Sequence, residues 1–129
     1  MSTWAELKAH VRARYALNND DDEGFSIEFT FDHGRSQLVG VHKFLTFDQT
    51  FLEFRTYVCK EDEMSPRVAL QMNDDFPLGG LALDQDGDYC FLYSAAIAAM
   101  TLHDFDLLLR VIARSADKLE SSYAGTDER

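Results

Sequence analysis

Three aspartates at alternate positions beside a glycine are the residues of this sequence that most resemble a metal site. Asp84, Asp86 and Asp88 stand in the segment DQDGDY, with Gly87 between the last two. An EF-hand loop also uses alternating carboxylates, but it needs glycine at its sixth position and glutamate at its twelfth. Counted from Asp84, the glycine falls at the fourth position and Ala95 at the twelfth. Asp-Gly between apolar runs predicts instead the turn of a β-hairpin, because a type I′ turn needs positive φ at both central residues.

No other spacing in the chain is typical of catalysis or metal binding. The sequence contains no His-x-x-x-His, Cys-x-x-Cys or Gly-x-Ser-x-Gly pattern. Gly79 and Gly80 precede a strand, whereas a phosphate cradle needs the N-terminus of a helix. We therefore expect no catalytic residue, no metal and no cofactor. A zinc site assembled from His33, His42 and a distant acid stays open, as does an enzyme whose site forms from remote residues.

Composition predicts one globular domain that spans residues 1–129. A chain of 129 residues with 46% hydrophobic residues and ten phenylalanines can bury a core of its own. Cys59 and Cys90 are too few for a disulfide framework, and both stand in apolar runs, so we expect reduced core thiols.

The charge is strongly acidic, with a formal net charge of -11. Nucleic-acid binding needs clustered Lys and Arg, so no nucleic-acid partner is expected. Residues 18 to 32 hold six acidic side chains and no basic one, which favours a basic partner, although acidity also serves solubility alone. No apolar run approaches the roughly 20 residues of a membrane span, and the N-terminus lacks a signal-peptide pattern. We therefore expect a cytoplasmic protein without a membrane partner.

Hydrophobic periodicity predicts an α+β fold, a single-layer antiparallel five-stranded sheet packed by helices in the order α-β-β-β-α-β-β-α. Capping patterns at Thr3, Ser65 and Thr101 start three helices, which cover residues 3 to 17, about 66 to 73, and 101 to a C-cap at Gly125. A solvated turn is expected at residues 18 to 24. Strands are expected at residues 25 to 31, 37 to 47, 50 to 60, 81 to 84 and 89 to 93. Residues 94 to 100 are compatible with a strand end or a loop.

The second strand is apolar on both of its faces, so it should be covered twice. Plain core is one explanation of this aromatic sheet. The other is a surface for another polypeptide, since a sheet with helices on one side leaves its other face exposed. On that hypothesis the candidate partner-binding residues are Val39, Val41, Phe44, Phe54 and Val58.

The segment QMNDDFPLGGLALDQDGDYCFLY, followed by TLHDFDLLLRVIARSADKLE, resembles the type III secretion chaperone-like fold. That fold includes secretion chaperones of the Tir-chaperone type and the YbjN-like proteins. The shared features are an asparagine that closes the middle helix, a glycine-containing start of the next strand, an Asp-Gly hairpin and a final helix that carries Ala116 and Asp117.

The resemblance implies a non-catalytic, homodimeric binder of another polypeptide. Secretion chaperones hold a partly unfolded segment of an effector on hydrophobic patches, partly by adding strands to the sheet. The middle helix, which often builds the chaperone dimer, is short here. The alternative that the resemblance leaves open is a YbjN-like regulatory or structural domain that binds a folded partner.

Overall fold

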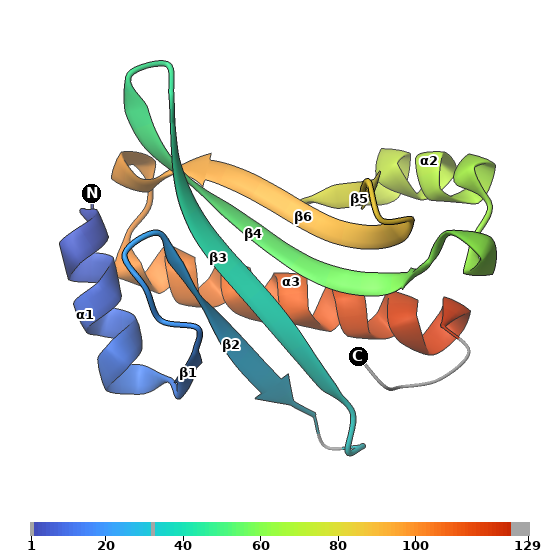
Figure 1. The fold of residues 1–129 in the computed structure, drawn as a ribbon, viewed down its shortest axis with the longest axis horizontal. Coiled ribbons are helices and arrows are strands. Elements are labelled where there is room, and N and C mark those ends of the chain that lie inside the picture. Colours follow the sequence, from blue (N-terminus) through green and yellow to red (C-terminus); the bar gives the residue numbers. More distant parts are fainter. Residues whose placement is uncertain (1, 32, 125–129) are drawn as a thin grey trace.

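The computed structural model describes residues 2–31 and 33–124, and the expected C-cap Gly125 and the acidic Asp32 lie outside these residues. Three helices, two short 3₁₀ helices and six strands follow one another along the described chain (Figure 1). Their order and bounds are α1 (Trp4–Arg14), β1 (Leu17–Asn18), β2 (Gly24–Thr30), β3 (Ser36–Thr46), β4 (Gln49–Lys60), η1 (Glu61–Glu63), α2 (Pro66–Asp75), β5 (Gly80–Leu83), β6 (Asp88–Ala96), η2 (Ile97–Ala99) and α3 (Leu102–Tyr123).

All six strands form one antiparallel sheet in the order β1-β2-β3-β4-β6-β5. The predicted α+β class is confirmed, but the predicted number of five strands is wrong. The first helix ends at Arg14 rather than residue 17, and Leu17 and Asn18 pair with Ile27 and Ser26 as a sixth, edge strand. A two-residue strand has no periodicity of its own, and its pairing depends on β2 lying beside it.

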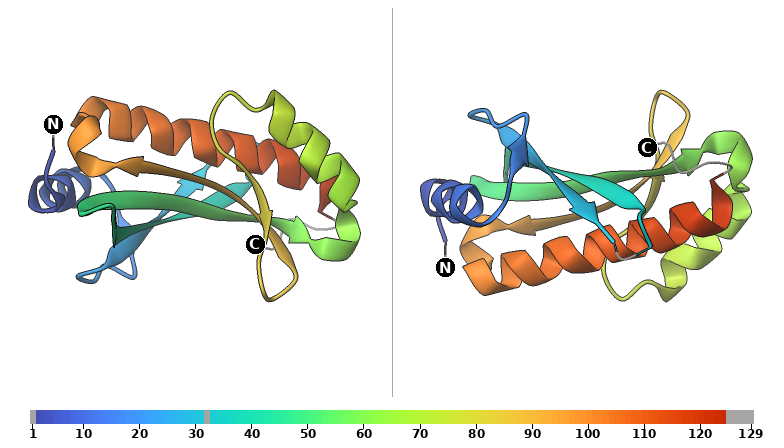
Figure 2. Two further views of the ribbon diagram at one scale, coloured as in Figure 1. Left: turned by 90° about the horizontal axis from the view of Figure 1, so that it is seen from above. Right: turned by 90° about the horizontal axis from the view of Figure 1, so that it is seen from below.

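Helix α3 covers one face of this sheet over most of its length (Figure 2). Its first turn is fixed by a capping box between Thr101 and Asp104. The side chains of Phe105, Leu109 and Ile112 are fully buried against the strands. The predicted apolar stripe is therefore confirmed, while Leu107, which was expected to broaden it, remains 45% exposed.

Two buried carboxylates beside this apolar stripe, those of Asp106 and Asp117, bind other elements to α3. Asp106 accepts a hydrogen bond from the Tyr15 hydroxyl at 2.7 Å, and its Oδ2 lies 2.9 Å from His10 Nε2. Burial, together with this hydrogen bond, raises the pKa of Tyr15 to about 12, so the hydroxyl keeps its proton and remains a donor. Toward the other end of α3, Asp117 accepts a hydrogen bond from Arg35 Nε at 3.1 Å. The end of α1 and the β2–β3 turn are thus tied to α3.

The acidic loop after α1 is held to that helix by Lys8. The Lys8 ammonium donates to Asp20 and to the backbone carbonyl of Asp21, and its stem is buried beside the rings of Trp4 and Phe25. Hydrogen bonds from Arg12 and from Lys8 lower the pKa of Asp20 to about 2. Residues 18–23 are solvent-exposed, as expected of a solvated turn, and these contacts hold the turn against α1.

The DQDGDY segment forms the turn between β5 and β6, so the predicted hairpin is confirmed. The predicted type I′ geometry is wrong, because residues 84–87 separate the two strands and only Gly87 among them has a positive φ. Oδ1 of Asp84 accepts hydrogen bonds from the backbone N–H groups of Asp86 and Asp88, each at 2.9 Å. Gly87 has a φ of 83°, a conformation that glycine adopts without a steric penalty. The carboxylate of Asp84 therefore closes the turn on its own backbone.

Helix α2 lies beside the edge strand β5 and occupies its hydrogen-bonding edge. The side-chain amide of Asn73 accepts from the backbone N–H of Leu81 at 2.7 Å and donates to the carbonyl of the same residue at 3.1 Å. This pairing imitates a strand neighbour and blocks the edge of β5 against another strand.

The β3–β4 hairpin extends beyond the helices and ends in a strained turn (Figure 1). Phe47 and Asp48 form its two-residue loop with φ values of 52° and 57°. This left-handed conformation suits glycine or asparagine, and it is unfavourable for a phenylalanine. The Phe47 side chain is 85% exposed, so its burial does not offset the free-energy cost of this backbone conformation.

We expect the double substitution Phe47→Asn with Asp48→Gly to stabilise the folded protein by about 1 kcal/mol, because it removes left-handed backbone strain. Urea unfolding followed by circular dichroism measures the change. Leu45→Asn is the matched control, since Leu45 is 76% exposed but lies in the strand. If the double variant and the wild type unfold at the same urea concentration, the turn is not strained.

Candidate partner-binding surface

The face of the sheet opposite α3 carries no helix within the described residues (Figure 2). Side chains alternate between the two faces of a strand, so β3 and β4 divide their residues between the α3 side and this open side. On β4, Leu52, Phe54 and Thr56 face α3 and are buried, while Glu53 and Arg55 between them are partly exposed. We call the open side the outer face.

Apolar side chains lie on the outer face at both ends of β3. Leu38 is 43% exposed and Phe44 is 38% exposed. The ring of Phe44 contacts the ring of Phe51, its partner across β3 and β4, with centroids 5.8 Å apart. Phe47 continues this apolar patch onto the hairpin tip, whereas Leu45 follows Val39 and Val41 in the alternation along β3 and is exposed on the opposite face. We call Leu38, Phe44, Phe47 and Phe51 together the apolar outer surface.

The centre of the outer face is polar. Arg55 Nε donates to Glu53 Oε1 at 2.9 Å on the same strand, and His42 is the neighbour of Glu53 on β3. Hydrogen bonding to Glu53, despite partial burial, raises the pKa of Arg55 further above its usual range. The outer face thus offers two apolar regions with an ion pair between them, so it can contact both apolar and charged groups.

The structure places only one of the five sequence-predicted contact residues on the outer face. Phe44 lies there. The other four, Val39, Val41, Phe54 and Val58, have no exposed surface and pack in the core beneath α3. This placement corrects the assignment of the sheet faces. Alternation identifies which residues share a face, but only the position of α3 decides which face is buried.

Sequence analysis also missed exposed apolar residues. Leu38, Leu45 and Phe47 are exposed on the β3–β4 hairpin, and the last two stand near its tip, where the periodicity predicted ordinary strand ends. The available signal was the phenylalanine immediately before Asp48, a position where a two-residue hairpin turn normally holds asparagine or glycine.

The cysteines and the ionisable side chains form no second candidate site in the described residues. Cys59 and Cys90 are buried free thiols, as predicted, and burial raises the pKa of the Cys90 thiol. Within residues 2–31 and 33–124, no group of three or more His, Cys, Asp and Glu side chains is arranged to hold a metal ion. None of the helices in this part of the chain has the length and apolarity of a membrane span.

Two solved structures contain chains that are similar to this one. A chain in the HopA1–SchA chaperone–effector complex superposes with a TM-score of 0.61 at 12% sequence identity, over 89% of this chain and 90% of that chain. A chain in the ExsC–ExsE complex gives a TM-score of 0.63 at 19% identity, over 93% and 92% of the two chains. The chain has the type III secretion chaperone-like fold.

This likeness extends over almost the whole of each chain and confirms the fold that the sequence resemblance implied. At these identities the comparison establishes the fold alone. No protein-family model and no curated protein sequence matches the chain. The resemblance to YbjN-like proteins stays a prediction.

We expect Val41→Asp to unfold the protein and Phe44→Asp to leave it folded. Val41 has no exposed surface, so an aspartate there would place an unpaired charge in the core, whereas Phe44 is 38% exposed. Circular dichroism and the midpoint of urea unfolding distinguish the two variants. A folded Val41→Asp variant would show that the two faces of the sheet are assigned the wrong way round.

Proposed function

We propose that this protein is a non-catalytic, chaperone-like module that binds a segment of another polypeptide on the apolar outer surface. The observation that carries the proposal is the exposure of Leu38, Phe44 and Phe47 on and beside a sheet face that no helix of the described residues covers. Apolar patches of this kind, rimmed by polar residues, are typical of protein-binding surfaces. A cytoplasmic location fits the same role.

The comparison adds a chemical class of partner. The HopA1–SchA structure is described as a complex of a chaperone with an effector, so a chain of this fold occurs in an assembly between two polypeptides. Carried over to the present chain, that role requires apolar contact area and no catalytic group. The apolar outer surface supplies this area on both sides of the ion pair between Glu53 and Arg55.

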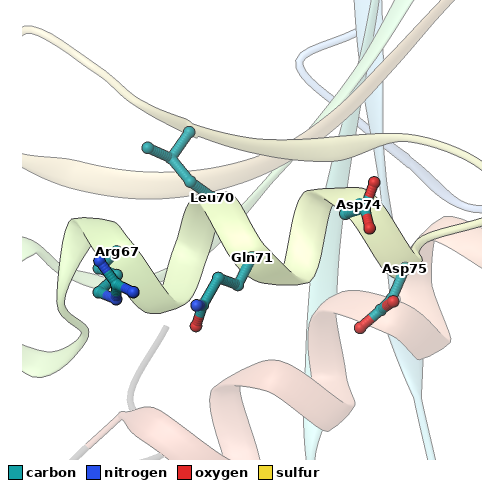
Figure 3. Close-up of a pocket in the computed structure, with 5 residues that line it drawn as sticks. All are labelled: Arg67, Leu70, Gln71, Asp74 and Asp75. Atoms are coloured by element: carbon teal, nitrogen blue, oxygen red, sulfur yellow. The ribbon is translucent and has the colours of Figure 1, made fainter.

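We further infer that two copies associate through α2. The exposed face of this helix presents Arg67, Leu70, Gln71, Asp74 and Asp75 (Figure 3). Arg67 lies near the first turn and the two aspartates near the last, with Leu70 and Gln71 between them. Leu70 is 70% exposed, which leaves a large apolar side chain in water.

The charges along this face of α2 are complementary to those on the same face of a second copy. In an antiparallel pair of α2 helices with the twofold axis between Leu70 and Gln71, Arg67 of each copy faces Asp74 of the other. A twofold interface uses the same patch on both subunits, so each favourable contact occurs twice. Leu83 of the neighbouring β5 is 47% exposed and widens the apolar part of this patch.

We expect Phe44→Asp to weaken binding of an unfolded polypeptide at least tenfold. The added charge would have to be desolvated beneath the bound segment. Fluorescence anisotropy with a reduced, carboxymethylated reference protein measures the affinity, and the native, disulfide-bonded form of the same protein tests selectivity for unfolded chains. Gln85→Asp is the matched control, since it adds the same charge at an exposed side chain in the β5–β6 turn, outside both the apolar outer surface and α2. Failure of the wild type to bind either form would reject the proposal.

We expect Arg67→Asp and Asp74→Arg each to dissociate the α2 dimer, because each places like charges opposite each other at both ends of the helix pair. A mixture of the two variants restores opposite charges at both ends and should therefore dimerise. Sedimentation velocity measures the masses of each variant and of the mixture. If the wild type is monomeric, or if the mixture behaves as the separate variants do, the α2 interface is wrong.

A further inference from the structure

The side of α3 that faces away from the sheet is basic, although the chain as a whole has a formal net charge of -11. Arg110, Arg114 and Lys118 stand at every fourth position, so they lie along one side of the helix over about 12 Å. Between residues 105 and 122, the other exposed side chains of α3 are Leu107, Ser121 and Ser122, none of which is charged. We call Arg110, Arg114 and Lys118 together the basic row.

The described part of the chain provides no partner for the basic row. None of its three side chains forms a hydrogen bond or an ion pair with another described residue. The buried carboxylates of Asp106 and Asp117 take their partners from α1 and the β2–β3 turn instead. The helix dipole does not explain the row either, because cations stabilise a helix in its last turn, and the last turn of α3 contains no basic residue. Like charges four positions apart repel one another, so the row slightly destabilises the free helix.

A hollow beside the basic row can receive a carboxylate. It lies between α3 and β2 and has a volume of about 170 Å³. Its lining residues are Phe29, Thr30, Phe31, Arg110, Ala113 and Arg114. The aromatic side chains exclude water from part of this space, so the attraction between a guanidinium group and an anion is screened less than on an open surface. A guanidinium group also binds a carboxylate through two parallel hydrogen bonds.

The spacing of the basic row indicates a helical occupant. A second helix that lies along α3 and carries acidic side chains at every fourth position places one carboxylate opposite each base. Leu107 adjoins the row and is 45% exposed, so it gives the contact an apolar part. Nucleic acids and anionic membranes fit less well, because they present many negative charges to a protein that is acidic overall.

We propose that the exposed side of α3 binds an acidic helix of a partner protein through the basic row. The helix carries three acidic side chains at every fourth position and an apolar side chain that contacts Leu107, and the carboxylate opposite Arg114 lies at the hollow. This inference goes beyond the proposed function. The basic row and the apolar outer surface lie on opposite sides of the sheet, so both can be occupied at the same time (Figure 2).

The probe for this site is a fluorescent helical peptide of alanine and glutamine with three glutamates at every fourth position and one leucine on the same side. Fluorescence anisotropy at low ionic strength should show binding to the wild type, and the affinity should fall as salt is added, because salt screens exposed charges. A second peptide of the same composition, with its glutamates distributed around the helix, should bind at least fivefold more weakly. The two peptides have the same net charge, so the comparison tests the spacing.

Charge reversal in the basic row tests the site on the protein. Arg114→Glu and Lys118→Glu should each weaken binding of the first peptide at least tenfold. Lys60→Glu is the matched control, since it makes the same change of charge at an exposed side chain at the end of β4, and it should change the affinity less than twofold. A peptide whose middle glutamate is replaced by lysine should bind the Arg114→Glu variant at least fivefold more tightly than the first peptide does. Circular dichroism confirms that the variants fold.

Three results would overturn this inference. The first is that the wild type does not bind the first peptide, or that Lys60→Glu weakens binding as much as Arg114→Glu does. The second is that a single-stranded oligonucleotide or vesicles with phosphatidylserine bind more tightly than the peptide and lose binding in the Arg114→Glu variant. The third is self-association of the wild type, measured by sedimentation velocity, that Arg114→Glu abolishes, because a second copy then occupies the basic row.

The failure of this inference can be told from the failure of the proposed function. Phe44→Asp changes the apolar outer surface and should alter binding of the acidic peptide less than twofold. The unfolded reference protein tests the apolar outer surface, and the acidic peptide tests the basic row. Either site can therefore be rejected while the other stands.

Discussion

Phe105, Leu109 and Ile112 of α3 are completely removed from solvent against the sheet, and this contact holds the other elements in place. Burial of three large apolar side chains contributes several kcal/mol, on the order of 2 kcal/mol for each. Because one helix supplies this cover, one face of the sheet is sealed and the opposite face is left open. The core residues of β3 and β4, among them Val41 and Phe54, are the sheet side of the same contact.

Two buried carboxylates on α3 determine which elements pack near each of its ends. Asp106 and Asp117 are each 8% exposed, so their charges need partners. Tyr15 and His10 satisfy the first from α1, and Arg35 and His33 satisfy the second from the β2–β3 turn. Removing any of these partners would leave a buried carboxylate less well compensated. The two clusters therefore fix where α1 and the β2–β3 hairpin lie along α3.

The edges and faces of the sheet differ in whether other elements cover them. Asn73 completes the hydrogen bonds of β5, so α2 closes that edge and presents its own exposed face to solvent. β5 pairs only with residues 89–92 of β6, so no strand of the described residues pairs with the same edge of β6 at residues 93–96. The strained turn at Phe47 projects an apolar side chain beyond the helices. The exposed apolar side chains of the sheet thus lie on the parts that α3 does not cover.

Local signals in the sequence determined most of the elements. Capping residues such as Thr101, the periodicity of α3 and the Asp-Gly turn act through neighbours a few residues away, so they predicted the α+β order and the β5–β6 hairpin. Only the tertiary structure decided what depends on distant parts of the chain. The two-residue strand β1 exists because β2 lies beside it, and Val39 and Val58 are core while Phe44 is surface because α3 packs on one face. Alternation in a strand defines two faces, but it contains no information about which of them a helix will cover.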